Sequence, residues 1–255
     1  MKTKYFHFLP GIRVLFFIIF FQVFCLSGKS QADQRQEVVN RLQMLSQKYH
    51  DTGYVSFDVK YRYANIAAPA KYLDSVQGSF KMNRGQYWYR LENTESISND
   101  SEVVTVFNDD KLIYIANAAT VKSANPLAMI DSVIYDNQYS STAIVKSKTQ
   151  DVITIDFNPG FPYKKIVYYI DNSSGFITKM IALIQADQLN DPGTKNMFDK
   201  TVDYGILQVD FSNYKTTGSS ATDFSSTRYV SKSGKIYQAV SAYATYQIIN
   251  SKSQN

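Results

Sequence analysis

The chain has 255 residues, with 27 basic and 22 acidic side chains and a formal net charge of +5. Four of the basic residues and none of the acidic ones lie in the first 32 positions, so residues 33–255 carry a charge of only +1. This balance gives no electrostatic support for nucleic-acid binding. The single cysteine, Cys25, excludes an intramolecular disulfide.

The first 32 residues have the pattern of a secretory signal peptide. Basic residues precede the apolar stretch 14–26, and the small residues Ser30 and Ala32 fit cleavage after Ala32. The apolar stretch is shorter than the ~20 residues that a membrane-spanning helix needs, which disfavours an uncleaved anchor. Lipidation of Cys25 is disfavoured because the bulky Phe24 precedes it. We therefore expect a mature chain of residues 33–255 that forms a single domain.

Residues 33–50 follow the pattern of an amphipathic helix. The apolar positions fall on one stripe at helical spacing: Val38, Leu42, Leu45 and Tyr49. Gly53 is the expected stop.

From residue 55 the pattern changes to period two. Along "VSFDVKYRY" one face is apolar, and it consists of Val55, Phe57, Val59, Tyr61 and Tyr63. The other face is polar, so residues 55–63 are predicted to form a half-buried strand.

A series of hairpins follows this strand. Segments 75–82 and 86–93 are joined by a turn at Asn83, Arg84 and Gly85. Three more hairpins are predicted from the segments 101–107 with 112–116, 141–147 with 151–157, and 165–170 with 176–184. Two or three further strands are predicted around 204–211, 226–232 and 242–249, with loops at 187–201 and 216–222.

A short helix is expected inside residues 125–139. Pro126 fits the first helical position, and Leu127, Ile130 and Ile134 follow at helical spacing. The predicted order is therefore one helix, then a long antiparallel meander with one helical insertion.

Several predicted strands are apolar on both faces, among them 103–107, 112–115, 152–157 and 166–170. A sheet with one face in water should alternate, so both faces of these strands are expected to be covered. Two helices are too few for a sheet of this size. The pattern therefore favours a curved sheet that surrounds its own interior, which can hold an apolar ligand.

Residues 33–255 offer little material for catalysis. His50 is their only histidine, and it is expected to be a solvated residue at the helix end. No cysteine remains and no glycine-rich phosphate loop occurs, so we expect no metal site and no cofactor. Glu92 and Glu95 could form a glycosidase pair, but a polar strand end and turn is the better interpretation.

Two polar segments between apolar runs, 108–110 and 171–175, could bind calcium or form turns. Asn, Asp and Ser are common in turns because their side chains bond to the local backbone, so turns are favoured. In the second segment we expect Asp171, Asn172 and Ser173 to form the bend, with Gly175 supplying backbone freedom. The sequence therefore predicts a protein that is not an enzyme.

The element order and the hairpin "PYKKIVYYIDNSSGFITKM" resemble the bacterial outer-membrane lipoprotein carrier superfamily (LolA/LolB-like). The match is best from Ile170 and Asp171 to Lys179. The resemblance implies a half-open, strongly curved antiparallel sheet with an N-terminal helix, a helical lid and a periplasmic location in a Gram-negative bacterium. It also implies an inward arginine on an early strand, whereas alternation turns Arg62 and Arg90 away from the apolar face.

We therefore expect a monomeric periplasmic carrier that binds lipid or lipoprotein acyl chains in an apolar cavity. The cavity lining is predicted to be Phe57, Val59, Tyr61, Phe80, Met82, Tyr89 and Leu91, and the lid Leu127, Met129 and Ile130. The alternative is an adaptor module of a cell-envelope or secretion complex, which contacts envelope membrane proteins through the same fold or an exposed sheet edge.

Overall fold

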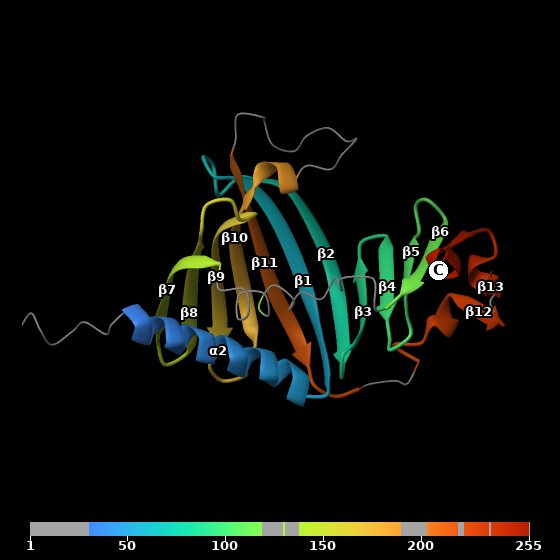
Figure 1. Ribbon diagram of the computed structural model, residues 1–255, viewed down its shortest axis with the longest axis horizontal. Coiled ribbons are helices and arrows are strands. Elements are labelled where there is room, and N and C mark those ends of the chain that lie inside the picture. Colours follow the sequence, from blue (N-terminus) through green and yellow to red (C-terminus); the bar gives the residue numbers. More distant parts are fainter. Residues whose placement is uncertain are drawn as a thin grey trace, which may run out of the picture.

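The computed structural model describes residues 31–118, 130, 138–189, 203–218, 222–234 and 236–254 (Figure 1). One long helix, α2 (Gln31–Asp51), precedes a large β-sheet, and short 3-10 helices occur late in the chain. The helix matches the predicted range, and the expected cleavage site after Ala32 falls in its first turn. Nearly all of the predicted signal peptide lies outside the described residues.

The strands form one large sheet and one small one. In chain order they are β1 (Tyr54–Asn65), β2 (Tyr72–Asn83), β3 (Gln86–Leu91), β4 (Thr94–Ser98), β5 (Glu102–Phe107), β6 (Leu112–Asn117), β7 (Tyr139–Lys146), β8 (Gln150–Phe157), β9 (Tyr163–Asp171), β10 (Ile177–Gln185), β11 (Tyr204–Lys215), β12 (Val230–Ser233), β13 (Ile236–Ala239) and β14 (Gln247–Asn250). The 3-10 helices are η1 (Ala186–Gln188), η2 (Ser226–Arg228), η3 (Ser241–Tyr243) and η4 (Ser251–Gln254).

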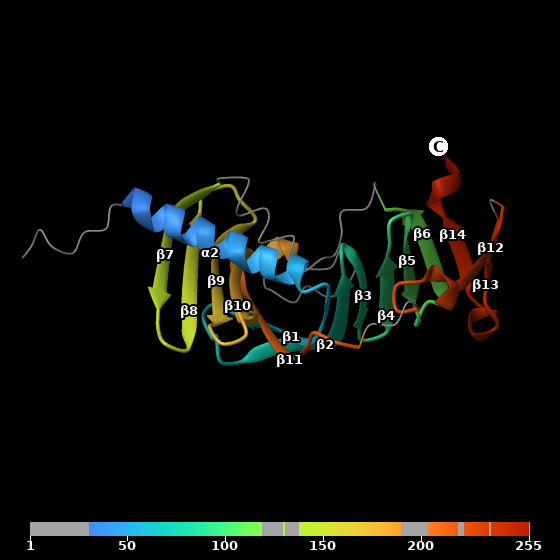
Figure 2. The same ribbon diagram turned by 90° about the horizontal axis from the view of Figure 1, so that it is seen from below.

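The large sheet has 12 strands in the order β14-β6-β5-β4-β3-β2-β1-β11-β10-β9-β8-β7, and β12 pairs with β13 separately. All neighbours are antiparallel except β14 and β6, which are parallel. The predicted curved, open sheet with an N-terminal helix is thereby confirmed (Figures 1 and 2). The parallel pair is a departure from the predicted meander. Parallel pairing of β14 with β6 is possible because the long segment between these two strands provides the crossover that such pairing needs.

Helix α2 lies across one face of the sheet, over β7 to β11, and we call this the inner face (Figure 2). Its predicted stripe is buried at 0–3% exposure and packs on the inner-facing residues of β1 and β8 to β11. Because side chains alternate along each strand, the residues that face α2 are apolar while their chain neighbours point to the other, outer face. The inner core is therefore explained by the helical spacing of apolar residues in α2 and by their alternation along the strands.

Backbone irregularities accompany the bend of the sheet beside β1. A Cβ atom at Gly78 would come within 2.1 Å of the Arg90 carbonyl oxygen, so only glycine permits β2 and β3 to approach so closely. The register of β1 against β11 shifts between Ser56 and Asp58, as in a β-bulge, and bulges bend strands and increase their twist. The predicted turn after β2 is confirmed, with Arg84 and Gly85 both at positive φ.

A second core lies on the outer face of β3 to β6. Trp88 alternates with Tyr87 and Tyr89, so it points away from the inner core. It packs with Ile97, Val104, Val106, Ile113 and Ile115 from the neighbouring strands and with Phe224, Tyr229 and Val230 from the C-terminal segment. We call residues 222–254 the C-terminal arm, because they cover this outer core and extend the sheet with β14 (Figure 2).

The expectation that doubly apolar strands are covered on both faces holds for only part of the sheet. In β5, Val103 is buried on the inner face and Val104 on the outer face. In β9, however, the outward Val167 and Tyr169 are only half-buried, so the expectation was wrong there. The reason is that β-branched and aromatic residues favour strands even on a half-exposed face.

Two predictions of elements were incomplete. The segment "RLENTESISND", residues 90–100, was interpreted as a strand end and turn, but it contains β4, whose Glu95, Ser96 and Ser98 are buried despite being polar. The C-terminal part contains four strands, β11 to β14, where two or three were expected. Within the described ranges, no helix combines the length and the apolar character needed to cross a membrane.

Candidate functional site

The seven residues predicted to line a cavity share the inner face of β1, β2 and β3. Phe57 pairs with Phe80, which pairs with Tyr89, so these three rings form a row across the strands. The ring centroids of Phe57 and Phe80 are 5.5 Å apart, and those of Phe80 and Tyr89 are 5.4 Å apart, both in stacked arrangements. The remaining predicted residues are Val59, Tyr61, Met82 and Leu91, which belong to or pack against the inner core.

The seven residues fall into two groups according to how deeply their side chains are buried. Phe57, Val59 and Phe80 are 2–3% exposed and therefore belong to the packed core. The other four are half-buried and rest against that core: Tyr61, Met82, Tyr89 and Leu91. Only these four present surface that a ligand can contact without unpacking the core.

Further half-buried residues extend this surface toward β9. Tyr63, Phe161, Tyr163 and Leu189 also pack against the inner core without being fully covered. Tyr163 of β9 pairs with Ile184 of β10, and Leu207 of β11 pairs with Tyr63 of β1. The surface therefore continues from the end of β9 to β1 across β10 and β11. We call the set Tyr61, Tyr63, Met82, Tyr89, Leu91, Phe161, Tyr163 and Leu189 the inner aromatic surface.

Tyrosine hydroxyls are gathered on this surface. Burial raises the pKa of Tyr61 to about 12, with further contributions from the neighbouring Tyr63 and Tyr89 hydroxyls. Burial likewise raises the pKa values of Tyr63 and Tyr163. These side chains therefore stay neutral at physiological pH, and the surface is apolar with hydrogen-bonding hydroxyls but without charge.

Of the predicted lid, only Ile130 lies within the described residues. It is helical and fully buried in the inner core, so at this position the insertion packs against the sheet. Leu127 and Met129 fall outside the described residues.

Helix α2 is fixed to the hairpin ends by a polar cluster that the sequence did not reveal. Arg41 Nε donates to Asp151 Oδ2 at 2.8 Å, and Asn172 Nδ2 donates to Asp151 Oδ1 at 3.1 Å. Asn172 also donates to the Ser147 carbonyl oxygen at 3.0 Å, which joins the β7–β8 and β9–β10 turns. Asn172 therefore belongs to a turn, as predicted, and in addition takes part in the attachment of α2.

The far end of α2 is fixed by aromatic contacts. Tyr49 and Tyr214 share a hydrogen bond of 2.7 Å between their hydroxyls, and Tyr214 donates to the Ile177 carbonyl oxygen at 2.8 Å. The rings of Phe176 and Tyr214 stack at 4.5 Å. The helix is thus held at its middle and near its C-terminal end, and the inner aromatic surface lies beside it.

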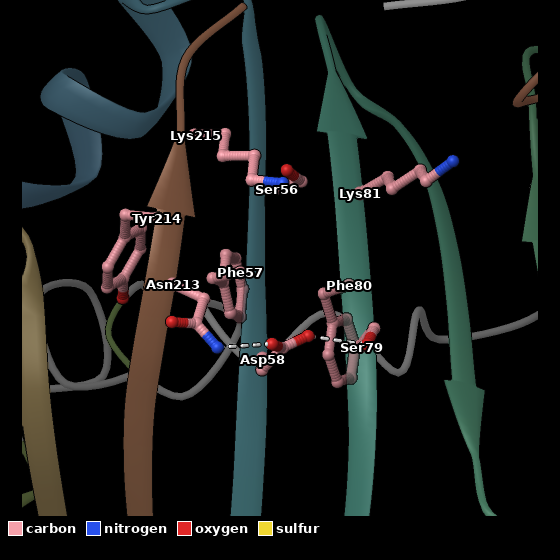
Figure 3. A pocket seen from close by; sticks show the side chains of 9 residues that line it. All are labelled: Ser56, Phe57, Asp58, Ser79, Phe80, Lys81, Asn213, Tyr214 and Lys215. Atoms are coloured by element: carbon pink, nitrogen blue, oxygen red, sulfur yellow. Dashed lines mark hydrogen bonds between the residues drawn. The ribbon is translucent and has the colours of Figure 1, made fainter. Parts of the chain in front are cut away.

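A polar pocket of about 550 Å³ occurs near the ends of β1, β2 and β11 that face the C-terminus of α2 (Figure 3). Asp58 accepts hydrogen bonds from Ser79 Oγ at 2.6 Å and from Asn213 Nδ2 at 2.8 Å. Asn213 has a positive φ of 55° at the bulge, and Lys81 pairs with Asp223 at 2.7 Å. Because Asp58 and Lys81 are both engaged, this arrangement supports a structural role in holding the bulge.

The residues considered for catalysis or metal binding have other roles in the structure. Glu95 is buried and binds Arg90 and Tyr229, while Glu92 is an exposed turn residue at positive φ, so the two do not form a catalytic pair. Asp171 accepts hydrogen bonds from Ser173 and Ser174, which lower its pKa to about 2, and Gly175 has a φ of 76°. The predicted turn is therefore confirmed.

His50 is exposed at the end of α2, as predicted. Among the described residues, no group of three or more His, Cys, Asp or Glu side chains could hold a metal ion.

The two early-strand arginines both lie on the outer face, as alternation predicted. Arg62 forms an ion pair with Asp210, and its guanidinium lies 4.8 Å from the centre of the Tyr72 ring. Arg90 binds Glu95 through two nitrogens at 2.6 and 3.0 Å. Neither can reach the inner face to hold a lid.

Comparison with known proteins gives remote structural likeness only. No family model matches the chain, and no curated protein matches it. An uncharacterized conserved protein from Thermus thermophilus is 9% identical with a TM-score of 0.43, and the match covers 84% of this chain and 98% of that one. A LolA superfamily protein from Nitrosomonas europaea is 10% identical with a TM-score of 0.33, covering 73% and 98%. The likeness to that superfamily is a remote one.

Proposed function

We propose that residues 33–255 form a single-domain, non-catalytic binding protein of the bacterial periplasm. It holds the acyl chain of a lipoprotein or another lipid against the inner aromatic surface and carries it as a monomer. This agrees with the secretory signal pattern and with the carrier resemblance of the sequence. Its structural support comes from the inner face itself.

One observation carries the proposal: the apolar inner face continues from β11 to β3, beyond the strands that α2 crosses. On the far side of the helix, Tyr61, Met82, Tyr89 and Leu91 are half-buried beside a packed core. An alkyl chain that covers them leaves water at a gain of about 0.8 kcal/mol per buried methylene group. The uncharged tyrosine hydroxyls at the surface do not oppose such a ligand.

The test is to identify the lipid that stays bound to the mature protein during purification. We expect protein purified from a membrane-containing host to release lipid in near-stoichiometric amount on extraction with organic solvent, as measured by mass spectrometry. Tyr89→Lys should remove most of this lipid, because a buried ammonium beside an alkyl chain is strongly unfavourable.

Tyr169→Lys is the matched control, since Tyr169 is a half-buried strand tyrosine on the outer face. It should retain the lipid. Phe57 is unsuitable for this test, because at 2% exposure a charged substitution there unfolds the core whether or not lipid binds. Folded Tyr89→Lys protein with unchanged lipid content would refute the proposal.

A second candidate is an adaptor of an envelope complex, favoured by the outer face of β8 to β11. The apolar side chains of that face are only half-buried, so part of each remains accessible: Val152, Val167, Tyr169, Ile181, Leu183 and Ile206. If this face binds a protein partner, purified protein should contain no lipid. Tyr169→Lys should then lose an envelope partner that Tyr89→Lys still binds.

A further inference from the structure

Tyr168, in the middle of β9, has a buried hydroxyl without a hydrogen-bond partner among the described residues. The side chain is 1% exposed, and its oxygen is one of two buried polar side-chain atoms left unpaired there. A buried hydroxyl that makes no hydrogen bond is costly, and most such groups in proteins are paired. The position therefore needs an explanation beyond packing, since phenylalanine would pack equally well.

The neighbours of Tyr168 on its own strand and on the two adjacent strands are apolar. The register places Ile153 on one side and Met180 on the other, and Ile166 and Ile170 lie on the same face of β9. A buried water needs two to four polar partners, and these neighbours supply none. A ligand that brings its own acceptor atom would satisfy the hydroxyl without any other polar group.

Tyr168 lies next to the inner aromatic surface. The strand register runs from Tyr168 through Met180 of β10 and Val209 of β11 to Tyr61, a member of that surface. Met180, its cross-strand neighbour, is 6% exposed, and its unbranched side chain can change rotamer readily. Ala182, the next inner-facing residue of β10, adds little bulk. Rotation of the Met180 side chain would therefore open a path from the surface to the hydroxyl.

We propose that the Tyr168 hydroxyl donates a hydrogen bond to the carbonyl oxygen of a bound acyl group. The ligand class is then a long-chain acyl ester or amide, whose carbonyl sits at Tyr168 while its alkyl chain lies along Tyr163, Tyr63 and Tyr61. An ester offers acceptors and no donors, which matches a phenol that has its proton free to donate. This inference rests on the proposed function, because it assigns a polar contact within the same lipid site.

The experiment compares two probes of similar chain length in wild-type and Tyr168→Phe protein. Methyl palmitate carries the carbonyl and hexadecane does not, and binding is measured by displacement of the neutral dye N-phenyl-1-naphthylamine. Loss of one hydrogen bond should weaken methyl palmitate binding by about threefold to tenfold. Hexadecane should bind both proteins equally.

Stability of the ligand-free protein supplies a second readout. Tyr168→Phe should leave its denaturation midpoint unchanged or raised, because it removes an unpaired buried hydroxyl. Tyr49→Phe is the matched control, and it should lower the midpoint because Tyr49 makes a 2.7 Å hydrogen bond to Tyr214.

The outcomes separate this inference from the function on which it rests. If wild-type protein binds neither probe, the proposed function fails and the inference falls with it. If wild-type protein binds methyl palmitate but Tyr168→Phe binds both probes as wild type does, only the role of Tyr168 is refuted. An equal loss for both probes, or a midpoint as low as that of Tyr49→Phe, would show a packing role and overturn the assignment.

Discussion

Glu95 shows how a single side chain can join two distant parts of this chain. Its Oε1 accepts from Arg90 on the neighbouring strand, and its Oε2 accepts from the Tyr229 hydroxyl of the C-terminal arm at 2.6 Å. The same hydroxyl accepts from Trp88 Nε1 at 3.2 Å. At 6% exposure the carboxylate is tolerable because both of its oxygens are bonded.

Glu95→Ala should lower the free energy of unfolding by about 1–3 kcal/mol, because it leaves the buried Tyr229 hydroxyl without its acceptor. Glu92→Ala, which removes an exposed glutamate from the preceding turn, should change it by less than about 0.5 kcal/mol. Chemical denaturation of both variants measures the difference. Similar values for the two would show that the Glu95 contacts are energetically neutral.

At the scale of elements, the sequence predicted those helices and strands whose apolar residues repeat at a regular local spacing. Helix α2 and the hairpin strands were located correctly because their apolar residues repeat at 3.6 or 2 positions. Strand β4 was missed because "TESIS" places Glu95, Ser96 and Ser98 in the interior, and the partner that satisfies Glu95 there, Tyr229, is distant in the sequence. The parallel pairing of β14 was missed for a related reason, since no local pattern names β6 as its neighbour.

The attachment of α2 gives a prediction about one element. Arg41→Ala should lower the free energy of unfolding by about 1–3 kcal/mol, because Asp151 is buried at 7% exposure and loses its cationic partner. Amide hydrogen exchange in α2 should become faster in the same variant. Gln43→Ala is the control on an exposed position of α2, and it should leave both measurements near the wild-type values.

The C-terminal arm should respond to acid through Glu102. Burial alone would raise the pKa of Glu102, but hydrogen bonds from Ser226, Tyr237 and Lys252 outweigh it and hold the pKa below its ordinary value of 4.5. A carboxylate with a lowered folded-state pKa stabilises the fold above pH 4.5, and that contribution is lost as the pH falls further.

Glu102→Gln should therefore be less stable than wild type at pH 7 and show a shallower loss of stability below pH 4.5. Denaturation curves collected from pH 7 to pH 3 test this, with Glu92→Gln as the exposed control. Parallel pH profiles for wild type and Glu102→Gln would contradict the assignment.

At the scale of the whole molecule, one sheet carries two cores on opposite faces. Sequence periodicity identified the inner core and the row of Phe57, Phe80 and Tyr89, because each lies on an alternating strand. It could not separate the core residues from the half-buried ones. That division depends on how far α2 reaches across the sheet, which is a tertiary property. The unpaired hydroxyl of Tyr168 was hidden for the same reason, since only packing shows which polar atoms lack partners.

The two cores should unfold separately, since α2 stabilises one and the arm the other, while the backbone ladder from β2 to β3 joins them. Trp88, the only tryptophan of the chain, lies in the outer core, so its fluorescence reports that core alone. Val104 in the outer core and Val209 in the inner core are 0% and 1% exposed, which makes them matched sites. Replacing either by alanine removes two methyl groups and should destabilise its own core by about 2 kcal/mol.

Val104→Ala should therefore shift the fluorescence transition to lower denaturant and leave the main circular dichroism transition nearly in place. Val209→Ala should shift the circular dichroism transition and affect fluorescence less. The inner core involves more strands and the helix, so it should dominate the circular dichroism signal. If each variant moves both transitions by the same amount, the sheet unfolds as one cooperative unit. The two cores are then not separate units of stability.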